Sequence, residues 1–368
     1  MDDNSTYERY SRQVVLKQFG EEGQQKLLQA SVLVIGAGGL GCPALQYLTA
    51  AGIGKISIAD DDVVSLSNLQ RQVLYRTADV GKPKAVTAAQ HLKSLNPSIN
   101  FATYGRIDNS NALSIFRDYD LIIDATDNFA SRYIINDACV LLSKPLIYGA
   151  VSKFEGQISV FNYRGSSNYR DLFPEPSGGI DNCEIAGVLG VLPGMIGTMQ
   201  ATEAIKIVTG VGTPLFDKLL SYNALNNQFY ELNISSSEIG KRLLPKTEKE
   251  FTERNYEREC NSDLQSVVEI NVDQFNKYIN DTNAIIIDVR EKGEQPSISE
   301  FDHIKMPLSK FSIAELDGIN KDVIFFCQTG KRSAGAARQL KNQSSKKVFS
   351  LKGGILSWKK MHDQILKA

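Results

Sequence analysis

The chain has 368 residues, 41 basic and 42 acidic, and its formal net charge of -1 excludes a strongly basic nucleic-acid-binding or membrane-surface protein. Its length predicts two or three domains, and an apolar content of 42% suffices for a sizeable core. The five cysteines are scattered and form no C-x-x-C pair, which predicts a reducing, cytoplasmic setting with free thiols. The polar start and the lack of a long apolar run predict neither a signal peptide nor a membrane span.

The first thirty residues are polar and have helical spacing. Tyr10 and Phe19 could dock on the body of the protein or on a second subunit. Arg12 stands between them, and from the sequence pattern alone it is expected to be a solvated surface charge.

A glycine-rich turn follows the first predicted strand. Residues 32–35 are a β-branched run typical of a buried parallel strand, and residues 40–51 are typical of a helix. The glycines of the turn are Gly36, Gly38, Gly39 and Gly41. In this context the backbone can approach a polyphosphate at the helix N-terminus. The turn alone leaves three interpretations open: it binds a dinucleotide, it binds ATP, or it binds nothing.

Three consecutive acids, Asp60 to Asp62, end the second predicted strand at 55–59. An acid about 20 residues past the glycines is placed to accept hydrogen bonds from ribose hydroxyls, which favours Asp60 as a functional residue. The three acids could instead form a solvated turn.

Two cations then favour ATP over a dinucleotide. Arg71 lies in a polar segment with Asn68, and Lys84 begins a helix predicted over 83–95. Attack at the α-phosphorus of a nucleoside triphosphate builds charge that arginine and lysine can neutralise, whereas a dehydrogenase needs no cation here. Either cation alone could be a surface charge.

A further carboxylate, Asp127, follows the strand predicted over 121–124. Because ligands of open α/β sheets bind outside the carboxyl ends of the strands, Asp127 falls on the same edge as Asp60. It could hold the Mg²⁺ that accompanies a triphosphate, and either it or Asn128 could cap the helix predicted over 129–142.

Beyond this point the first domain is expected to close with an irregular loop, a cysteine and a hairpin. The loop, 165–179, is rich in Gly, Ser, Pro and Asn and is expected to be mobile over the site. Cys183 follows in polar surroundings that can favour a thiolate, although an isolated cysteine is usually inert. The strands predicted in this half, besides the three above, are 99–104, 145–150, 157–163, 218–222 and 228–232.

The most informative cysteine is Cys327, at the end of a strand predicted over 322–326 in a second α/β domain. Backbone N–H groups of the following loop can form an anion nest around the sulfur, and nearby cations and the helix dipole lower the pKa of such a thiol. A phosphatase loop needs arginine where Ser333 stands, so this shorter loop suits a persulfide; a buried structural cysteine is the alternative. The expected persulfide cradle is Cys327, Gln328, Thr329, Gly330, Lys331 and Arg332.

With these residues in place, two family resemblances follow. Residues 8–232 resemble the MoeB/ThiF/HesA branch of the ubiquitin-activating superfamily. The matching motifs are Arg9–Gln13, Gly36–Gly41, Asp60 with Ser67–Gln72, Gly81–Lys84 and Asp124–Asn128. Residues 264–368 resemble a rhodanese domain. Its motifs are Asp288–Glu291, His303-Ile304, Cys327–Ser333 and Gly353–Ile355.

The resemblance implies an α/β fold in two parts. A Rossmann-like ATP-binding adenylation domain with a mixed sheet would occupy 1–232, a charged linker 233–263, and a smaller α/β rhodanese domain 264–368. The implied enzyme is an adenylyltransferase that uses ATP and Mg²⁺ to activate the C-terminal glycine of a ubiquitin-like sulfur-carrier protein of the MoaD or ThiS type. A rhodanese persulfide would then convert that carboxyl into a thiocarboxylate.

The same resemblance implies the pathway and the partners. Molybdopterin biosynthesis is the expected pathway, thiamine biosynthesis is the alternative, and a carrier for tRNA thiolation also fits. The carrier would end in Gly-Gly, the sulfur donor would be a cysteine desulfurase or thiosulfate, and the enzyme would be a homodimer. Neither a membrane nor a nucleic acid is expected as a direct partner.

The resemblance also implies residue roles. The glycine turn would cradle phosphates, Asp60 would bind ribose, Arg71 and Lys84 would contact the triphosphate, and Asp127 would hold Mg²⁺. The remaining implied roles are nucleotide contacts by Asp62 and Asn68, a contribution of Arg12 across the dimer, an acyl link or acyl disulfide on Cys183, and the persulfide on Cys327.

One departure from the family concerns structural zinc, which members commonly bind through two C-x-x-C pairs. The first pair would fall at Asn168 to Asp171, where both cysteines are missing, and the second near Cys260, which has no C-x-x-C partner. A closed site of this kind needs four ligands. We therefore expect no zinc, and expect this loop to be held by packing or to be disordered.

Two other classes of function stay open at this point. The glycine turn permits a NAD-dependent oxidoreductase, but His91, His303 and His362 lie away from the motifs and suggest no catalytic pair. A non-catalytic carrier-binding scaffold would keep the fold without needing the full set of charged residues.

Overall fold

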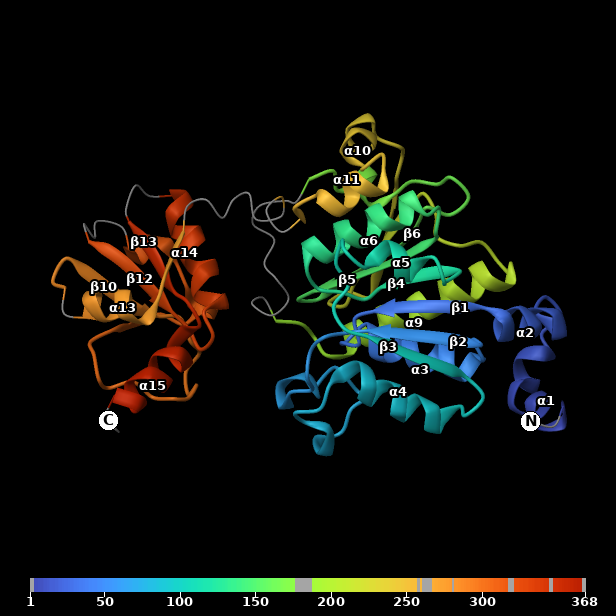
Figure 1. Ribbon diagram of the computed structural model, residues 1–368, viewed down its shortest axis with the longest axis horizontal. Coiled ribbons are helices and arrows are strands. Elements are labelled where there is room, and N and C mark those ends of the chain that lie inside the picture. The colour runs from blue at the N-terminus through green and yellow to red at the C-terminus, as the bar shows by residue number, and fades with distance from the viewer. Residues whose placement is uncertain are drawn as a thin grey trace. The chain divides into compact units, whose positions relative to one another are not determined.

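The computed structural model describes residues 3–175, 187–256, 259, 267–279, 281–316, 321–343 and 347–365 (Figure 1). The chain divides into two compact units, 1–260 and 261–368, and each is described here by itself. Within the described ranges, no helix has the length and apolar character that crossing a membrane requires.

The first unit is built on an eight-stranded mixed sheet with the order β3-β2-β1-β4-β5-β6-β7-β8. The strands from β3 to β5 run parallel, and β6, β7 and β8 are added antiparallel. The α/β fold with a mixed sheet is therefore confirmed. The strands are β1 (Ser31–Ile35), β2 (Lys55–Ala59), β3 (Asn100–Tyr104), β4 (Leu121–Asp124), β5 (Leu146–Ser152), β6 (Glu155–Phe161), β7 (Lys218–Asn223) and β8 (Gln228–Asn233).

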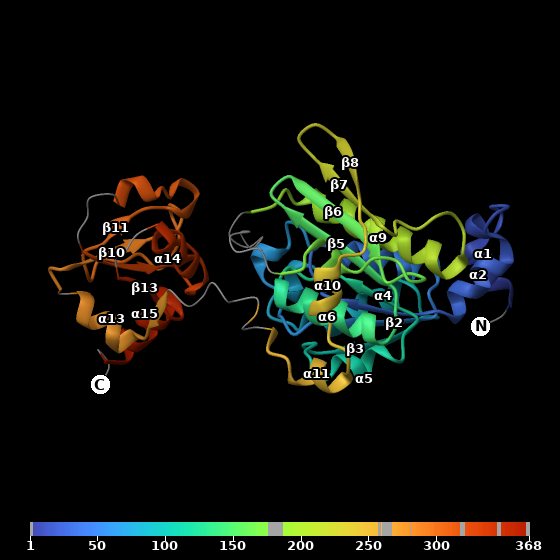
Figure 2. The same cartoon turned by 90° about the horizontal axis from the view of Figure 1, so that it is seen from above.

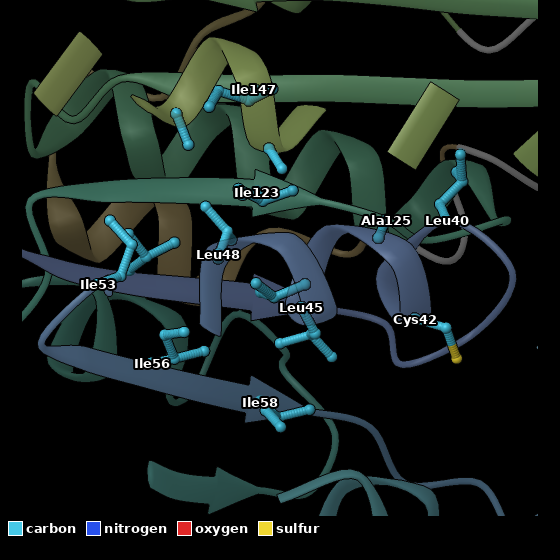
Figure 3. Close-up of a cluster of buried hydrophobic side chains, with 14 of the residues drawn as sticks. Leu40, Cys42, Leu45, Leu48, Ile53, Ile56, Ile58, Ile123, Ala125 and Ile147 are labelled. Carbon is cyan, nitrogen blue, oxygen red and sulfur yellow. The ribbon is translucent and has the colours of Figure 1, made fainter. Parts of the chain in front are cut away.

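Helices cover both faces of this sheet, because alternate residues of the buried strands point to opposite sides. Val32 and Val34 of β1 pack with α3, α4 and α9, whereas Leu33 and Ile35 pack with α5 and α6. Figure 3 shows part of the first cluster, with Leu45 and Leu48 of α3 close to Ile123 of β4. The β7–β8 hairpin projects at the sheet edge (Figure 2). The helices are α1 (Asp3–Val14), α2 (Gly20–Gln29), α3 (Gly41–Ala51), α4 (Lys84–Leu95), α5 (Ala112–Phe116), α6 (Phe129–Leu141), α7 (Tyr169–Leu172), α9 (Val191–Thr209), α10 (Glu238–Leu243) and α11 (Glu248–Glu253), with 3₁₀ turns η1 (Leu66–Asn68) and η2 (Thr77–Asp79).

The N-terminal helices lie at the end of the sheet where β1 begins (Figure 1). Tyr10 is buried and accepts a 2.8 Å hydrogen bond from the Asn96 amide, and a Cβ on Gly52 would meet its ring at 2.6 Å. Gln13 donates to the carbonyl of Ala51 at the C-terminus of α3. The first helix therefore docks on the body of its own chain and is not only a solvated surface helix.

The segment expected to be a linker, 233–263, packs on the first unit over much of its described length. Phe251 and Tyr256 are buried in the same apolar cluster as helix α6. Asn109 donates from its side-chain amide to the carbonyls of Thr252 and Arg254 at 2.6 and 3.0 Å. The expectation of a linker is wrong for these residues, because two aromatic side chains anchor a sequence that is otherwise strongly charged.

The second unit is a smaller α/β domain around a parallel sheet with the order β11-β10-β12-β13-β9. Apolar clusters lie on both faces, with Val323 and Phe325 of β12 on one side and Ile324 and Phe326 on the other. Its elements are β9 (Val268–Ile270), α13 (Val272–Ile279), β10 (Ala284–Asp288), β11 (Ile304–Lys305), η4 (Leu308–Lys310), η5 (Ile313–Leu316), β12 (Asp322–Phe326), α14 (Lys331–Gln343), β13 (Val348–Leu351) and α15 (Gly354–Ile365).

Candidate functional site

The glycine turn joins β1 to α3, and at two of its positions the neighbouring backbone leaves no room for a Cβ atom. Gly36 has a φ of +96°, and a Cβ there would lie 2.6 Å from the carbonyl oxygen of Ala125. A Cβ on Gly41 would lie 1.9 Å from the carbonyl oxygen of Gly36. These two positions require glycine, so the turn and the loop after β4 are in direct contact.

Asp60 supports this turn from the end of β2. Its Oδ2 accepts from the N–H of Ala37 at 2.7 Å, and its Oδ1 accepts from the N–H of Asp62 at 2.9 Å. Burial raises the pKa of Asp60, and the nearby Lys84 ammonium opposes that rise. Each carboxylate oxygen has two acceptor positions, so Asp60 can hold the turn and still accept from a ribose hydroxyl.

Lys84 brings a positive charge to the same edge. Its Nζ lies 2.9 Å from Oδ2 of Asp62, and its N–H donates to the Asp62 carbonyl at 2.9 Å. The Lys84 side chain is only 6% exposed, whereas that of Asp62 is 72% exposed. The Lys84 side chain is therefore fixed by its buried surroundings, whereas the carboxylate of its partner Asp62 faces solvent.

Arg71 lies against the turn from the polar segment after β2. A Cβ on Gly39 would meet the Arg71 Cγ at 3.5 Å and the Pro193 ring at 3.0 Å. The guanidinium Nη1 donates to the carbonyl of Ser67 at 3.3 Å, and Asn68 accepts from the N–H of Ser65 at 3.2 Å. Arg71 is therefore beside the glycines, while the Asn68 side chain is used to cap its own 3₁₀ turn.

Asp127 follows β4 in the loop that touches Gly36, and it is exposed. Asn128 is the N-cap of α6, since its Oδ1 accepts from the N–H of Ser131 at 2.9 Å. The helix-capping alternative thus belongs to Asn128. An exposed carboxylate beside the glycine turn fits Mg²⁺, which prefers a few carboxylate ligands plus phosphate oxygens.

Two neighbours of the turn were not predicted as site residues. The hydroxyl of Tyr75 donates to the Ala37 carbonyl at 2.8 Å. Gln72 is 4% exposed, lies beside Gly38, and its Oε1 has no hydrogen-bond partner within the part of the chain that the structure describes. The only indication in the sequence is that Gln72 and Tyr75 closely follow Arg71.

Arg12 is exposed and lies at the opposite end of the sheet from the glycine turn, since the neighbouring Gln13 contacts the C-terminus of α3. It therefore does not join the nucleotide residues of its own chain. Cys183, predicted as a second reactive thiol, and Cys260 fall outside the described residues.

The positions where family members carry zinc ligands do not fit that metal here. Asn168 and Asp171 occupy the first pair of positions, and Oδ1 of Asp171 accepts from the N–H of Ser237 at 2.7 Å. Cys260, near which the second pair is expected, lies outside the described residues. The described ranges hold no group of three or more His, Cys, Asp or Glu side chains suited to a metal. Within the loop expected to be mobile, residues 167–170 are buried, with Tyr169 in the apolar cluster that includes α6, and 176–179 lie outside the described ranges.

The second unit presents the other candidate site at the C-terminal end of β12. Cys327 is fully buried, and its Sγ accepts from the N–H of Gly330 at 3.1 Å and from the Ser333 hydroxyl at 3.5 Å. Gly330 has a φ of +94°, and a Cβ there would lie 3.0 Å from the N–H nitrogen of Gly353. One backbone N–H and one hydroxyl of this loop therefore point at the sulfur.

Arg332 is paired with a residue that the sequence did not single out. Its two terminal nitrogens contact both carboxylate oxygens of Glu294 at 2.5 Å, and this contact lowers the pKa of Glu294. Gln328 donates from its side-chain amide to the Gln295 carbonyl at 3.2 Å, and Thr329 is exposed. The loop at 291–296 therefore lies against the loop that follows Cys327. Glu294 was missed because its partner is 38 residues away.

Together, the fold and the two sites define a nucleotide-binding adenylation unit joined to a rhodanese-like unit. Comparison with known families agrees: residues 10–241 match the ThiF family and residues 271–361 match the rhodanese-like domain. The chain belongs to the ThiF family, and it is an adenylyltransferase with a sulfurtransferase domain.

Three relatives are similar over much of the chain. A protein of Porphyra purpurea named "Probable molybdopterin-synthase adenylyltransferase" is 41% identical, with 96% of this chain and 92% of that protein covered. A protein of Mycobacterium tuberculosis named "Probable adenylyltransferase/sulfurtransferase MoeZ" is 39% identical, with the same shares covered. A "Sulfur carrier protein adenylyltransferase" of Thermus thermophilus is 50% identical over 62% of this chain and 87% of its own.

Among solved structures, E. coli MccB crystallised with ATP has the same fold in its corresponding part. Its TM-score is 0.54 at 22% sequence identity, with 62% of this chain and 72% of that chain covered. At this identity the similarity supports the fold alone.

Proposed function

We propose that this enzyme adenylates the C-terminal glycine of a small ubiquitin-like sulfur-carrier protein and passes sulfur from Cys327 to the activated carboxyl. The observation that carries the proposal is the convergence of the glycine turn, Asp60, Arg71 and Lys84 on one sheet edge, in a chain whose other unit cradles a thiol. The name of the Thermus relative supports the choice of a sulfur carrier, and that of the Porphyra relative supports molybdopterin synthesis as the pathway.

In the proposed first step, a carboxylate oxygen of the carrier attacks the α-phosphorus of ATP. The bond from the α-phosphorus to the bridging oxygen breaks, and pyrophosphate leaves with that electron pair. Arg71 and Lys84 would neutralise the charge that develops on the phosphates, and Asp60 would orient the ribose. Asp127 would hold Mg²⁺, which supplies further charge neutralisation when bound.

In the proposed second step, the terminal sulfur of the Cys327 persulfide attacks the acyl carbonyl and AMP leaves. The product is an acyl disulfide between the carrier and Cys327. A second thiolate then attacks the Cys327 sulfur and releases the thiocarboxylate. We propose Cys183 for that thiolate; the resulting disulfide needs a cellular thiol as reductant, and a cysteine desulfurase or thiosulfate would reload the persulfide.

The proposal includes a cytoplasmic homodimer. Arg12 lies at the far end of its own sheet, next to Gln13, so any role at the nucleotide requires the site of a second copy. The scattered, unpaired cysteines of the sequence support a reducing compartment.

The test is carrier-dependent exchange of labelled pyrophosphate into ATP, with thiosulfate:cyanide sulfurtransfer measured on the same preparations. Arg71→Ala should reduce exchange by roughly 10²-fold and leave sulfurtransfer unchanged. Cys327→Ala should abolish sulfurtransfer and leave exchange intact. Unchanged exchange in Arg71→Ala would refute the nucleotide site, and loss of both activities in Cys327→Ala would refute two separable sites.

A further inference from the structure

Two short turns meet at Asn168 to Asp171, one of the two positions where the family resemblance implies structural zinc. Asn168 caps α7, and its Oδ1 accepts from the N–H of Arg170 at 2.9 Å. Oδ2 of Asp171 accepts from the N–H of Asn168 at 2.9 Å, and its Oδ1 accepts from the N–H of Ser237 at 2.7 Å. The Ser237 hydroxyl in turn accepts from the N–H of Gly240 at 3.1 Å. One carboxylate therefore joins both turns.

The four positions have the spacing of two C-x-x-C pairs, namely 168 with 171 and 237 with 240. The turns are nevertheless too close for a metal between them. A Cβ on Gly240 would lie 2.7 Å from the Arg170 carbonyl oxygen and 3.0 Å from Oδ1 of Asp171. A zinc ion with thiolate ligands needs bonds of about 2.3 Å to four side chains, and here one position has no space for a side chain.

A buried ion pair strengthens the same region. Nε and Nη2 of Arg170 each donate to one carboxylate oxygen of Asp137 at 2.8 Å, and both side chains are almost fully buried. The Tyr256 hydroxyl donates to Oδ2 of Asp137 at 2.9 Å, and Arg170 also donates to the Pro174 carbonyl at 3.2 Å. The pair thus ties α7 to α6 and to the end of the segment at 233–256.

We propose that this clasp, made of Asn168, Asp171, Ser237, Gly240 and the Asp137–Arg170–Tyr256 network, replaces structural zinc in this enzyme. It does so by direct hydrogen bonds and a bidentate ion pair, so the turns stay joined without a metal. The inference does not depend on the proposed activity. It names a set of residues outside the nucleotide and persulfide sites whose task is to hold the C-terminal part of the adenylation unit.

The first test is the metal content of the full-length protein, purified under reducing conditions without chelators. We expect no zinc above background, and treatment with 1,10-phenanthroline should leave the melting of the first unit unchanged. That melting can be assigned, because Trp358 is the single tryptophan of the chain and lies buried in the second unit. A calorimetric transition with no accompanying change in tryptophan fluorescence belongs to the first unit. Stoichiometric zinc would overturn the proposal.

The second test breaks the clasp. Arg170→Met should lower the melting temperature of the first unit by roughly 6 to 15 °C, because it removes two charge-assisted hydrogen bonds from the buried Asp137 carboxylate and leaves Arg254, at 3.6 Å, as its remaining cation. The matched control is Arg242→Met, at an exposed arginine of α10, which should change it by no more than about 2 °C. Equal melting of Arg170→Met and the control would overturn the proposal.

Two milder variants keep the proposal testable if Arg170→Met does not fold. Tyr256→Phe removes one hydrogen bond to Asp137 and should lower the same melting temperature by a few degrees. Gly240→Ala places a methyl group against the Arg170 carbonyl and should also destabilise, whereas Gly105→Ala, where a Cβ would meet nothing within 4 Å, should not. If both Tyr256→Phe and Gly240→Ala melt like the wild type, the clasp is wrong.

Discussion

Replacing Lys84 by methionine separates the charge of this residue from its packing. Methionine keeps an unbranched apolar side chain of similar length, so it can fill the space of the buried stem while the ammonium is lost. The partner carboxylate of Asp62 is 72% exposed and stays hydrated when the ammonium is removed. Loss of the pair should therefore cost about 0–1 kcal/mol of stability, and the melting temperature should fall by no more than roughly 4 °C.

The expected effect on adenylation is much larger. The Lys84 side chain is 6% exposed and lies at the edge that carries the glycine turn, so its charge is held in place before any reaction. Removing one preorganised donor from a site where charge develops typically costs about 2.7–4 kcal/mol, which corresponds to roughly 10²- to 10³-fold in kcat. Lys84→Met should thus be nearly as stable as the wild type and almost inactive in pyrophosphate exchange.

The matched control is Lys82→Met, two residues away. Lys82 also pairs with a carboxylate, that of Asp79 at 2.9 Å, but its side chain is 53% exposed and it is not among the proposed nucleotide residues. Exchange should stay within about threefold of the wild type in this variant. If Lys84→Met keeps more than a tenth of wild-type exchange, or if both variants lose the same activity, the reasoning about a preorganised cation is refuted.

Three further predictions concern other contacts. Glu294→Gln should raise the rate of thiosulfate:cyanide sulfurtransfer roughly fivefold. The substitution weakens an ion pair worth about 1 kcal/mol, so the Arg332 guanidinium becomes available to attract an anionic sulfur donor. An unchanged or lower rate in that assay would contradict this prediction. Gly41→Ala should abolish the melting-temperature increase caused by ATP, since its Cβ would lie 1.9 Å from a carbonyl oxygen of the turn; persistence of that increase would mean that the turn does not bind ATP. The hydrogen bond from Lys82 lowers the pKa of Asp79 from its ordinary value of 3.8 to about 2. The stability that this pair contributes is therefore fully present when the pH is above 3.8, and it is lost as the pH falls toward 2. The difference in melting temperature between the wild type and Lys82→Met should accordingly vanish over that interval, and a difference that grows on acidification would show that the sign is wrong.

Much of the fold and of the candidate site was accessible from the sequence, because the signals are local. Short apolar runs predict strands such as 121–124, and glycine spacing between a strand and a helix predicts the turn from Gly36 to Gly41. The cysteine loop at Cys327 was predicted in the same way. In each case the chemistry sits within a few residues of the element that positions it, so periodicity and turn composition suffice.

The tertiary structure decided which distant residues become partners. In the structure Arg332 pairs with Glu294, and Arg170 pairs with Asp137. From the sequence, only the Cys327 thiol was expected as a neighbour of Arg332. The segment at 233–263 looked like a charged linker, but Phe251 anchors part of it to the first unit.

The sequence by itself determined which two families the chain resembles. It also determined the glycine turn after the first strand and the short loop that follows Cys327. Only the tertiary structure decided how Lys84 is buried, that Asn128 rather than Asp127 caps α6, and that Ser237 and Gly240 face Asn168 and Asp171. The reason is physical. Local backbone preference depends on a few neighbouring residues, whereas a hydrogen bond or ion pair between segments depends on the strand order and helix packing that bring those segments together.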